Sequence, residues 1–144
     1  MTENDAASRT GPVRVAGPER PARARVLFVD DDANLGTLAR IMLEQIGCEV
    51  TIAASGPAGL QLVLDRPERF DLVLTDQVMP ELSGMALAAR IRAVRPDLPV
   101  VLCTGGSHHD EHRARRAGVR EVLLKPLTSR DLAALLDRLL PTAA

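Results

Sequence analysis

The sequence predicts an α/β fold, a doubly wound (βα)5 architecture whose five parallel strands lie in the order 2-1-3-4-5. Two observations lead to this prediction. Short apolar runs alternate five times with segments of helical periodicity. Most of these runs are apolar throughout, as in strands that helices cover on both faces of a parallel sheet. Right-handed crossovers leave few strand orders open to such a chain.

The first strand is predicted at residues 26–29, where VLFV offers four apolar residues suited to the middle of a sheet. Apolar residues then recur at spacings of three and four over residues 35–46, which predicts an amphipathic helix. Gly47 follows the last apolar residue of this pattern. Because glycine is typical of the position after a helix, we expect the helix to end there.

The second strand is predicted at residues 49–54, EVTIAA. Ser55 precedes the next helical segment, residues 56–66, and serine is a preferred N-cap because its hydroxyl accepts a hydrogen bond from a free backbone N–H. Residues 71–75, DLVLT, are the third buried strand.

The fourth unit repeats this plan. Ser83 is the predicted cap of a helix over residues 84–95, and Pro96 ends that helix because proline restricts the residue before it. Residues 99–103, PVVLC, are the fourth strand.

The last third of the chain contains a predicted helix at residues 107–117, which carries little apolar surface and is expected to be exposed or mobile. Gly118 ends it. The fifth strand is predicted at residues 122–124. Thr128 then begins a pattern that resembles a capping box, which opens a helix over residues 131–140.

Length and composition predict one domain, residues 25–141, between a disordered N-terminal tail (residues 1–24) and a short C-terminal tail (residues 142–144). The net charge of −1 gives no reason to expect a nucleic-acid partner. The apolar runs are too short to span a bilayer, and the N-terminus lacks a signal peptide's apolar region, so we expect a cytoplasmic location without a membrane partner. Cys48 and Cys103 lie within apolar patterns and are expected to be buried free thiols.

Polar and charged side chains gather where the predicted strands end. They are Asp30, Asp31 and Asp32 after the first strand, Asp76 after the third, Thr104 at the end of the fourth and Lys125 at the end of the fifth. In the order 2-1-3-4-5 the first and third strands are neighbours, so their carboxylates are expected to meet at one edge of the sheet. Oxygen ligands are those that Mg²⁺ selects when it assists phosphoryl chemistry, which predicts a magnesium site.

In these motifs the sequence resembles the receiver domain of bacterial two-component response regulators, a CheY-like domain of flavodoxin-like fold. The similarity covers about residues 25–140. It rests on four motifs in order: VLFVDDD with its acidic pair, TDQVMP with its aspartate, PVVLCTGG with its threonine, and LLKPLT with its lysine-proline pair. Each motif alone is weak, but their order and spacing together are specific.

The resemblance implies a role for each matching residue. The phosphoacceptor is Asp76. The ligands of Mg²⁺, the expected cofactor, are Asp30, Asp31, Asp76 and the backbone carbonyl of Val78. The remaining residues are the switch hydroxyl of Thr104, the phosphate-binding Lys125, and Pro126 in a structural turn.

By the same resemblance we expect a stand-alone receiver, a signalling domain and not an enzyme, that accepts its phosphoryl group from a sensor histidine kinase or a histidine phosphotransfer protein. Self-phosphorylation from small donors and slow autodephosphorylation are also expected. The output is protein–protein contact through about Ser107 to Leu140, or service as a phosphorelay shuttle or sink, by a monomer or a phosphorylation-dependent dimer.

Two alternatives remain open. One is a receiver-fold adaptor that acts without phosphorylation, which the intact set of site residues disfavours. The other is a flavodoxin-like small-molecule binder, because the same strand order can hold flavin at the same edge. The acidic character of this edge and the absence of Trp and Tyr to stack on a flavin both disfavour that alternative.

Three departures from the family pattern affect what the resemblance implies. Val122 stands where an aromatic switch residue is common, so the aromatic partner of the usual coupling to the threonine is missing. Gly105 and Gly106 predict a flexible loop. Because Val78 and Gly106 have no polar side chain to orient an attacking water, we expect the aspartyl phosphate to be comparatively long-lived.

Two other polar groups have simpler interpretations. Asp32 is expected to cap the first helix, and this can be its whole role. His108, His109 and His112 lie close in sequence, but they do not form the HExxH zinc motif and no third ligand is apparent, so a solvated helix start is preferred.

Overall fold

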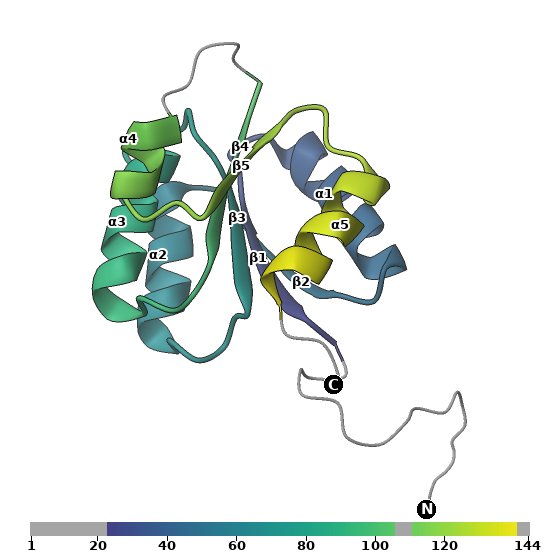
Figure 1. Ribbon diagram of the computed structural model, residues 1–144, viewed down its shortest axis with the longest axis horizontal. Coiled ribbons are helices and arrows are strands. Elements are labelled where there is room, and N and C mark those ends of the chain that lie inside the picture. The colour runs from purple at the N-terminus through teal and green to yellow at the C-terminus, as the bar shows by residue number, and fades with distance from the viewer. Residues whose placement is uncertain (1–22, 106–110, 141–144) are drawn as a thin grey trace, which may run out of the picture.

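Five parallel strands form the central layer of this computed structural model, in the order β2-β1-β3-β4-β5 (Figure 1). The structure describes residues 23–105 and 111–140. The strands are β1 (Arg25–Val29), β2 (Glu49–Ala53), β3 (Leu72–Asp76), β4 (Val100–Thr104) and β5 (Glu121–Leu124). Each neighbouring pair is parallel. The predicted fold class and strand order are therefore confirmed.

Helices cover both faces of the sheet. They are α1 (Ala33–Gln45), α2 (Gly56–Asp65), α3 (Gly84–Val94), α4 (Glu111–Arg116) and α5 (Ser129–Leu139). In Figure 1, α1 and α5 lie on one side of the sheet, whereas α2, α3 and α4 lie on the other. The parallel strands need crossover connections, and the helices on the two faces supply them.

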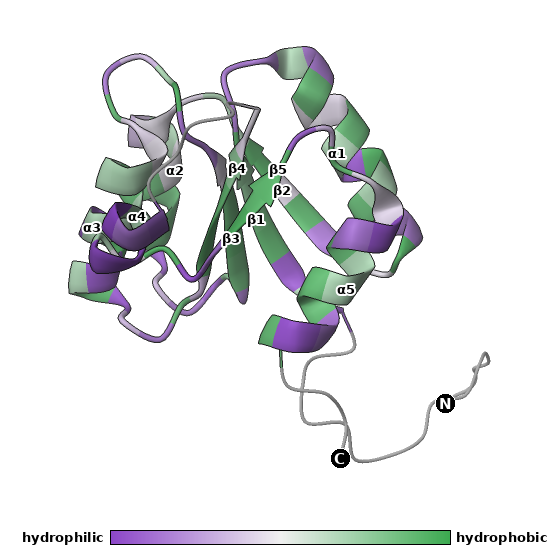
Figure 2. Cartoon of the chain, turned by 45° about the horizontal axis from the view of Figure 1, so that its top comes forward, coloured by the Kyte–Doolittle hydropathy of each residue, from purple (hydrophilic) through white to green (hydrophobic). Residues whose placement is uncertain are grey.

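The core has two parts, one on each face of the sheet, because successive strand residues point to opposite sides. Val26, Phe28 and Leu74 pack on the face that α1 and α5 cover. Leu27 and Val29, which alternate with them in β1, pack on the face of α2, α3 and α4. Figure 2 shows this as strands coloured hydrophobic along most of their length. A sheet with two buried faces accounts for runs that are apolar throughout.

The helix caps that the sequence predicts are confirmed. Ser55 accepts a hydrogen bond from the Ala58 N–H, and the other three predicted caps, Asp32, Ser83 and Thr128, likewise accept from backbone N–H groups of α1, α3 and α5. Capping depends on local sequence, so single residues fix these boundaries well. α5 begins at Ser129, two residues before the predicted start, because the helical backbone begins directly after its cap.

α4 is described over Glu111–Arg116, and the predicted start at residue 107 lies outside the described residues. Gly106, Ser107, His108 and His109 lie outside the described residues, as do most of the predicted N-terminal tail and all of the C-terminal tail. Ala114 is the one buried residue of α4, which agrees with the prediction of an exposed helix. Figure 2 shows α4 coloured hydrophilic.

Cys48 and Cys103 are buried and form no disulfide, as predicted. None of the helices in the described part of the chain is both long enough and apolar enough to cross a lipid bilayer.

Candidate functional site

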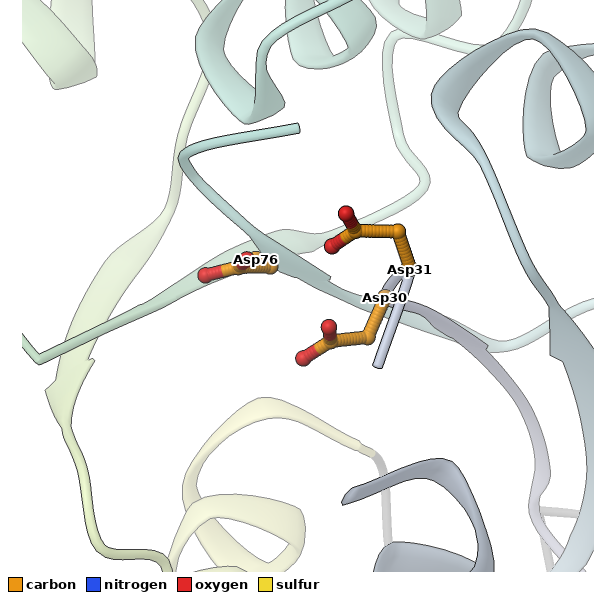
Figure 3. A group of neighbouring side chains, drawn as sticks. All are labelled: Asp30, Asp31 and Asp76. Atoms are coloured by element: carbon orange, nitrogen blue, oxygen red, sulfur yellow. The ribbon is translucent and has the colours of Figure 1, made fainter. Parts of the chain in front are cut away.

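Three carboxylates lie together where β1 and β3 end (Figure 3). One oxygen from each of Asp30, Asp31 and Asp76 lies within 4.8 Å of the others. The pairing of β1 with β3 aligns Val29 with Thr75, so the residues that follow in the two strands are neighbours. The structure thus brings these three aspartates together, as the strand order predicts.

Asp30 is the most buried member of this group, with a residue exposure of 2%. Its backbone N–H donates to the Ala53 carbonyl at 3.1 Å, which fixes its place beside β2. Its Oδ1 accepts from the Asp32 N–H at 2.9 Å. Burial raises the pKa of Asp30, and the nearby Asp76 charge adds to the rise, although the Asp32 N–H and Lys125 oppose it. An uncompensated negative charge is therefore costly at this position.

Lys125 brings a positive charge between two of the aspartates. Its Nζ lies 3.1 Å from Asp76 Oδ1 and 3.4 Å from Asp30 Oδ2. Burial acts to lower the pKa of Lys125, but the hydrogen bond to Asp76 and the charges of both aspartates exceed that effect and raise it. Lys125 is therefore a protonated cation that offsets part of the carboxylate charge.

The backbone also positions Lys125. Its N–H donates to the Thr104 carbonyl at 2.9 Å, which ties the residue after β5 to the last residue of β4. The Lys125–Pro126 peptide bond is cis, and Pro126 lies in the turn between β5 and α5. Thr104 is 7% exposed at the end of β4, one strand away from Asp76.

Contacts that were not predicted from the sequence hold the segment after Asp76 in place. The Thr75 hydroxyl donates to the Asp76 carbonyl at 2.9 Å. Gln77 accepts from the Gly84 N–H through its carbonyl and from the Met85 N–H through its side chain. A Cβ at Gly84 would clash with the Asp76 carbonyl oxygen, so only glycine allows this close approach. The one sequence feature that pointed to this arrangement was Gly84, which directly follows the predicted cap Ser83.

The two atypical valines have different surroundings. Val78 has an exposure of 80% and presents an aliphatic side chain to solvent two residues after Asp76. Val122 is partly buried and packs against the core on the α2, α3 and α4 face. It pairs in register with Leu102 of β4. At the expected aromatic switch position, β5 therefore presents an aliphatic side chain to this core in place of an aromatic ring.

Cys103 is the strand neighbour of Asp76, since β3 and β4 pair these two residues in register. Burial raises the pKa of its thiol to about 12. The thiol is therefore neutral at physiological pH, and this cysteine is a packing residue and not a nucleophile.

The donor set of the acidic cluster fits a hard divalent cation. Three carboxylates face one lysine, so an excess of negative charge remains when all four groups are ionised. Oxygen donors of mixed burial, with Asp31 exposed to solvent, suit Mg²⁺, which keeps several waters when it binds proteins. His112 is exposed and belongs to no such cluster among the residues that the structure describes.

Comparison with known proteins gives a consistent result. Residues 26–137 match the family described as "Response regulator receiver domain". The chain is 40% identical over 122 residues to "Transcriptional regulatory protein GlrR" of Escherichia coli K12, a match that covers 84% of this chain and 27% of that protein. The chain therefore spans about a quarter of the length of this relative.

Solved structures of similar fold are receiver domains. A response regulator receiver domain protein from Clostridium thermocellum has a TM-score of 0.76 and 33% identity, with 80% of this chain and 92% of that chain covered. The receiver domain of a sensor histidine kinase from Pseudomonas aeruginosa PAO1, described with a magnesium ion coordinated in its active site cleft, has a TM-score of 0.74 and 28% identity, with 82% and 98% covered.

Proposed function

Because the chain belongs to the family of response regulator receiver domains, we propose that it accepts a phosphoryl group on Asp76 in a reaction that needs Mg²⁺. The observation that carries this proposal is the convergence of Asp30, Asp31 and Asp76 with Lys125 at one edge of the sheet. Receiver domains interact with histidine kinases and with output partners, so the phosphoryl group is a signal and not a step in metabolism.

In the proposed transfer, a carboxylate oxygen of Asp76 attacks phosphorus, and the bond from phosphorus to the donor's imidazole nitrogen or acyl oxygen breaks. Asp30, Asp31, Asp76 and the backbone carbonyl of Val78 would hold Mg²⁺, which supplies positive charge between two anionic reactants. Lys125 is already 3.1 Å from Asp76 and is suited to hold a phosphoryl oxygen as a point charge.

The proposed output is a changed protein surface. Phosphorylation adds up to about two negative charges at Asp76, and the Thr104 hydroxyl at the end of the neighbouring strand can donate to the phosphoryl group. We assign the output surface to about Ser107 to Leu140, of which residues 107–110 lie outside the described part. Val122 replaces a bulky switch residue, so the switch relies on Thr104 and the loop after it.

The proposed phosphodonor is a sensor histidine kinase or a histidine phosphotransfer protein. The receiver, residues 25–141, would then act as a sink, a relay shuttle or an adaptor, as a monomer or a phosphorylation-dependent dimer. Two buried cysteines that form no disulfide agree with a cytoplasmic location. The transcriptional role in the relative's name is not carried over, because this chain spans 27% of that protein.

Intact-mass measurement tests the proposal. The protein is incubated with acetyl phosphate or phosphoramidate, with and without Mg²⁺, in parallel with Asp76→Asn and the control Asp65→Asn. Asp65 is an exposed aspartate at the end of α2, before β3 begins, whereas Asp76 lies at the far end of that strand. We expect one phosphoryl group on the wild type and the control, only with Mg²⁺, and none on Asp76→Asn. A gain that persists in Asp76→Asn would refute the proposal, as would no gain from either small donors or a phosphohistidine donor.

A further inference from the structure

A polar cavity lies at the opposite edge of the sheet from the acidic cluster. It has a volume of about 290 Å³ and is bounded by α3, by the end of α4 and by the residues that lead into β4 and β5. Its charged residues are Arg92, Arg115 and Arg120, and its apolar floor includes Leu98 and Val119. No carboxylate side chain lines it.

The three guanidinium groups form no ion pair with a carboxylate of the described residues. Arg92 Nη2 donates to the Arg116 carbonyl at 3.2 Å, and Arg115 Nη1 donates to the Arg120 carbonyl at 3.1 Å. The neighbouring Glu121 carboxylate is paired with Arg138, with a shortest distance of 2.7 Å; that pair is the main cause of its lowered pKa, to which the charges of Arg115 and Arg120 add. Because a guanidinium has five N–H donors, most donors of these arginines remain for other partners.

The backbone around the cavity holds the arginines in place. Gly118 has a φ of +107°, and a Cβ there would lie 3.2 Å from Arg92 Cδ, so the glycine leaves room for the arginine stem. The Arg120 N–H donates to the Val100 carbonyl at 2.7 Å, which fixes the cavity's floor to β4. The carbonyls after α4 would repel an anion, but Arg92 and Arg115 each donate to one of these groups.

We propose that this arginine cavity, defined by Arg92, Arg115 and Arg120, binds a compact polyphosphate anion of the class of pyrophosphate and nucleoside diphosphates. Three like charges gathered around one concavity match a ligand that concentrates several negative charges in a small volume. Guanidinium forks suit phosphate oxygens, which they can hold through two parallel N–H···O bonds. A cavity of about 290 Å³ favours such a compact ligand over an acidic peptide, which needs an extended groove.

A ligand in the arginine cavity would join α3 to the segment between α4 and β5. It would use none of the residues that the proposed phosphorylation needs. The two inferences therefore stand or fall separately, and Asp76→Asn is expected to bind the anion as the wild type does.

The experiment is a two-dimensional ¹H–¹⁵N NMR titration of the full chain with pyrophosphate and, separately, with ADP, at constant ionic strength and with EDTA to remove divalent cations. We expect saturable shifts centred on the amides of Gly118, Val119 and Arg120. The double variant Arg92→Gln with Arg115→Gln should weaken binding by about tenfold or more. The double variant Arg66→Gln with Arg130→Gln, which removes the same charge elsewhere, should bind as the wild type does.

The spectra also report whether each variant is folded. If the glutamine double variant does not fold, Arg92→Lys and Arg115→Lys, which keep the charge but lose the fork, should weaken binding in its place. Equal affinity in these variants and the wild type would overturn the proposal, and so would shifts centred on Asp76. Equal affinity for sulfate, or tighter binding of a glutamate-rich peptide than of pyrophosphate, would also overturn it.

Discussion

The acidic cluster and the arginine cavity each gather like charges at one edge of the same sheet, but they differ in burial and in counter-charge. Asp30 has a side-chain exposure of 1% and shares Lys125 with Asp76. The three arginines are exposed at their own cavity, and two of them, Arg92 and Arg115, donate to backbone carbonyls. Repulsion between buried charges is strong and needs a counter-ion, whereas water and salt screen exposed charges. Substitutions at the two edges should therefore have different energetic effects.

The largest expected effect on stability is that of Lys125→Met in metal-free protein. This change leaves Asp30 and Asp76 close together without their cation, and we expect the free energy of unfolding to fall by about 2 kcal/mol, less than for a fully buried pair. Because the pKa of Lys125 is raised on folding, its contribution is full below the unfolded lysine's pKa and is lost as pH rises through the folded value.

Chemical denaturation at neutral pH, with and without Mg²⁺, measures this effect. Mg²⁺ should recover part of the loss, because the cation replaces the missing positive charge. The control is Arg138→Gln, which breaks the exposed pair with Glu121 and should change stability little. If Arg138→Gln lowers the free energy of unfolding as much as Lys125→Met does, then burial is not the reason why substitutions at the two edges differ in their effect on stability.

The next effect is kinetic and concerns the phosphorylated acidic edge. We expect the double variant Val78→Asn with Gly106→Glu to lose its phosphoryl group about tenfold faster, a change of about 1.4 kcal/mol in the barrier, because polar side chains would orient the attacking water. Loss of phosphoryl mass over time after removal of the donor gives the rate. If the aspartyl phosphate of the wild type lives no longer than that of the double variant, this expectation is wrong.

A smaller effect of opposite sign is expected for Asp30→Asn. The amide keeps an oxygen that can accept from the Asp32 N–H but carries no charge, so the metal-free variant should be more stable by about 1 kcal/mol at neutral pH, the size of a typical single-site effect. A carboxyl whose pKa is raised on folding favours the folded state below its unfolded pKa. That stability is lost as pH rises through the folded value.

The advantage of Asp30→Asn should therefore vanish at acidic pH, where the wild-type carboxyl is protonated. Thermal unfolding across pH values tests this. Mg²⁺ should raise the melting temperature of the wild type more than that of the variant. Equal Mg²⁺ responses would show that Asp30 is not part of a magnesium site.

The smallest effect is expected at the arginine cavity. Arg92→Gln loses one hydrogen bond to the Arg116 carbonyl but relieves repulsion with two other arginines, so stability should stay within about 0.5 kcal/mol of the wild type. Added salt should reduce any difference, since these charges are exposed. Chemical denaturation of the variant and the wild type, at low and at high ionic strength, measures this stability difference and the effect of salt on it. A loss as large as that of Lys125→Met would mean that the arginines are structural.

The sequence was sufficient for those features that depend on local pattern. Apolar runs predicted the strands, and Ser55 and Thr128 were recognised as caps because capping involves residues close in the chain. The meeting of Asp30 with Asp76 was predictable because strand order brings the ends of β1 and β3 together.

Other features depend on side-chain contacts between distant segments, and the sequence could not supply them. Lys125 contacts two carboxylates that are far from it in the sequence. Asp30 lies 95 positions before it and Asp76 lies 49 positions before it. The close approach of Gly84 to the Asp76 carbonyl depends on how a loop folds back. The arginine cavity combines α3 with the end of α4, and in sequence its members look like ordinary surface arginines.

We propose that Asp76 is the residue that carries the phosphoryl group. The most direct test of this proposal is to phosphorylate the wild type with acetyl phosphate and Mg²⁺, reduce the acyl phosphate with borohydride, and locate the resulting homoserine by peptide mass spectrometry. We expect homoserine at position 76. Homoserine at position 30 or 31 instead, or at none of the three in protein shown to carry the phosphoryl mass, would contradict it.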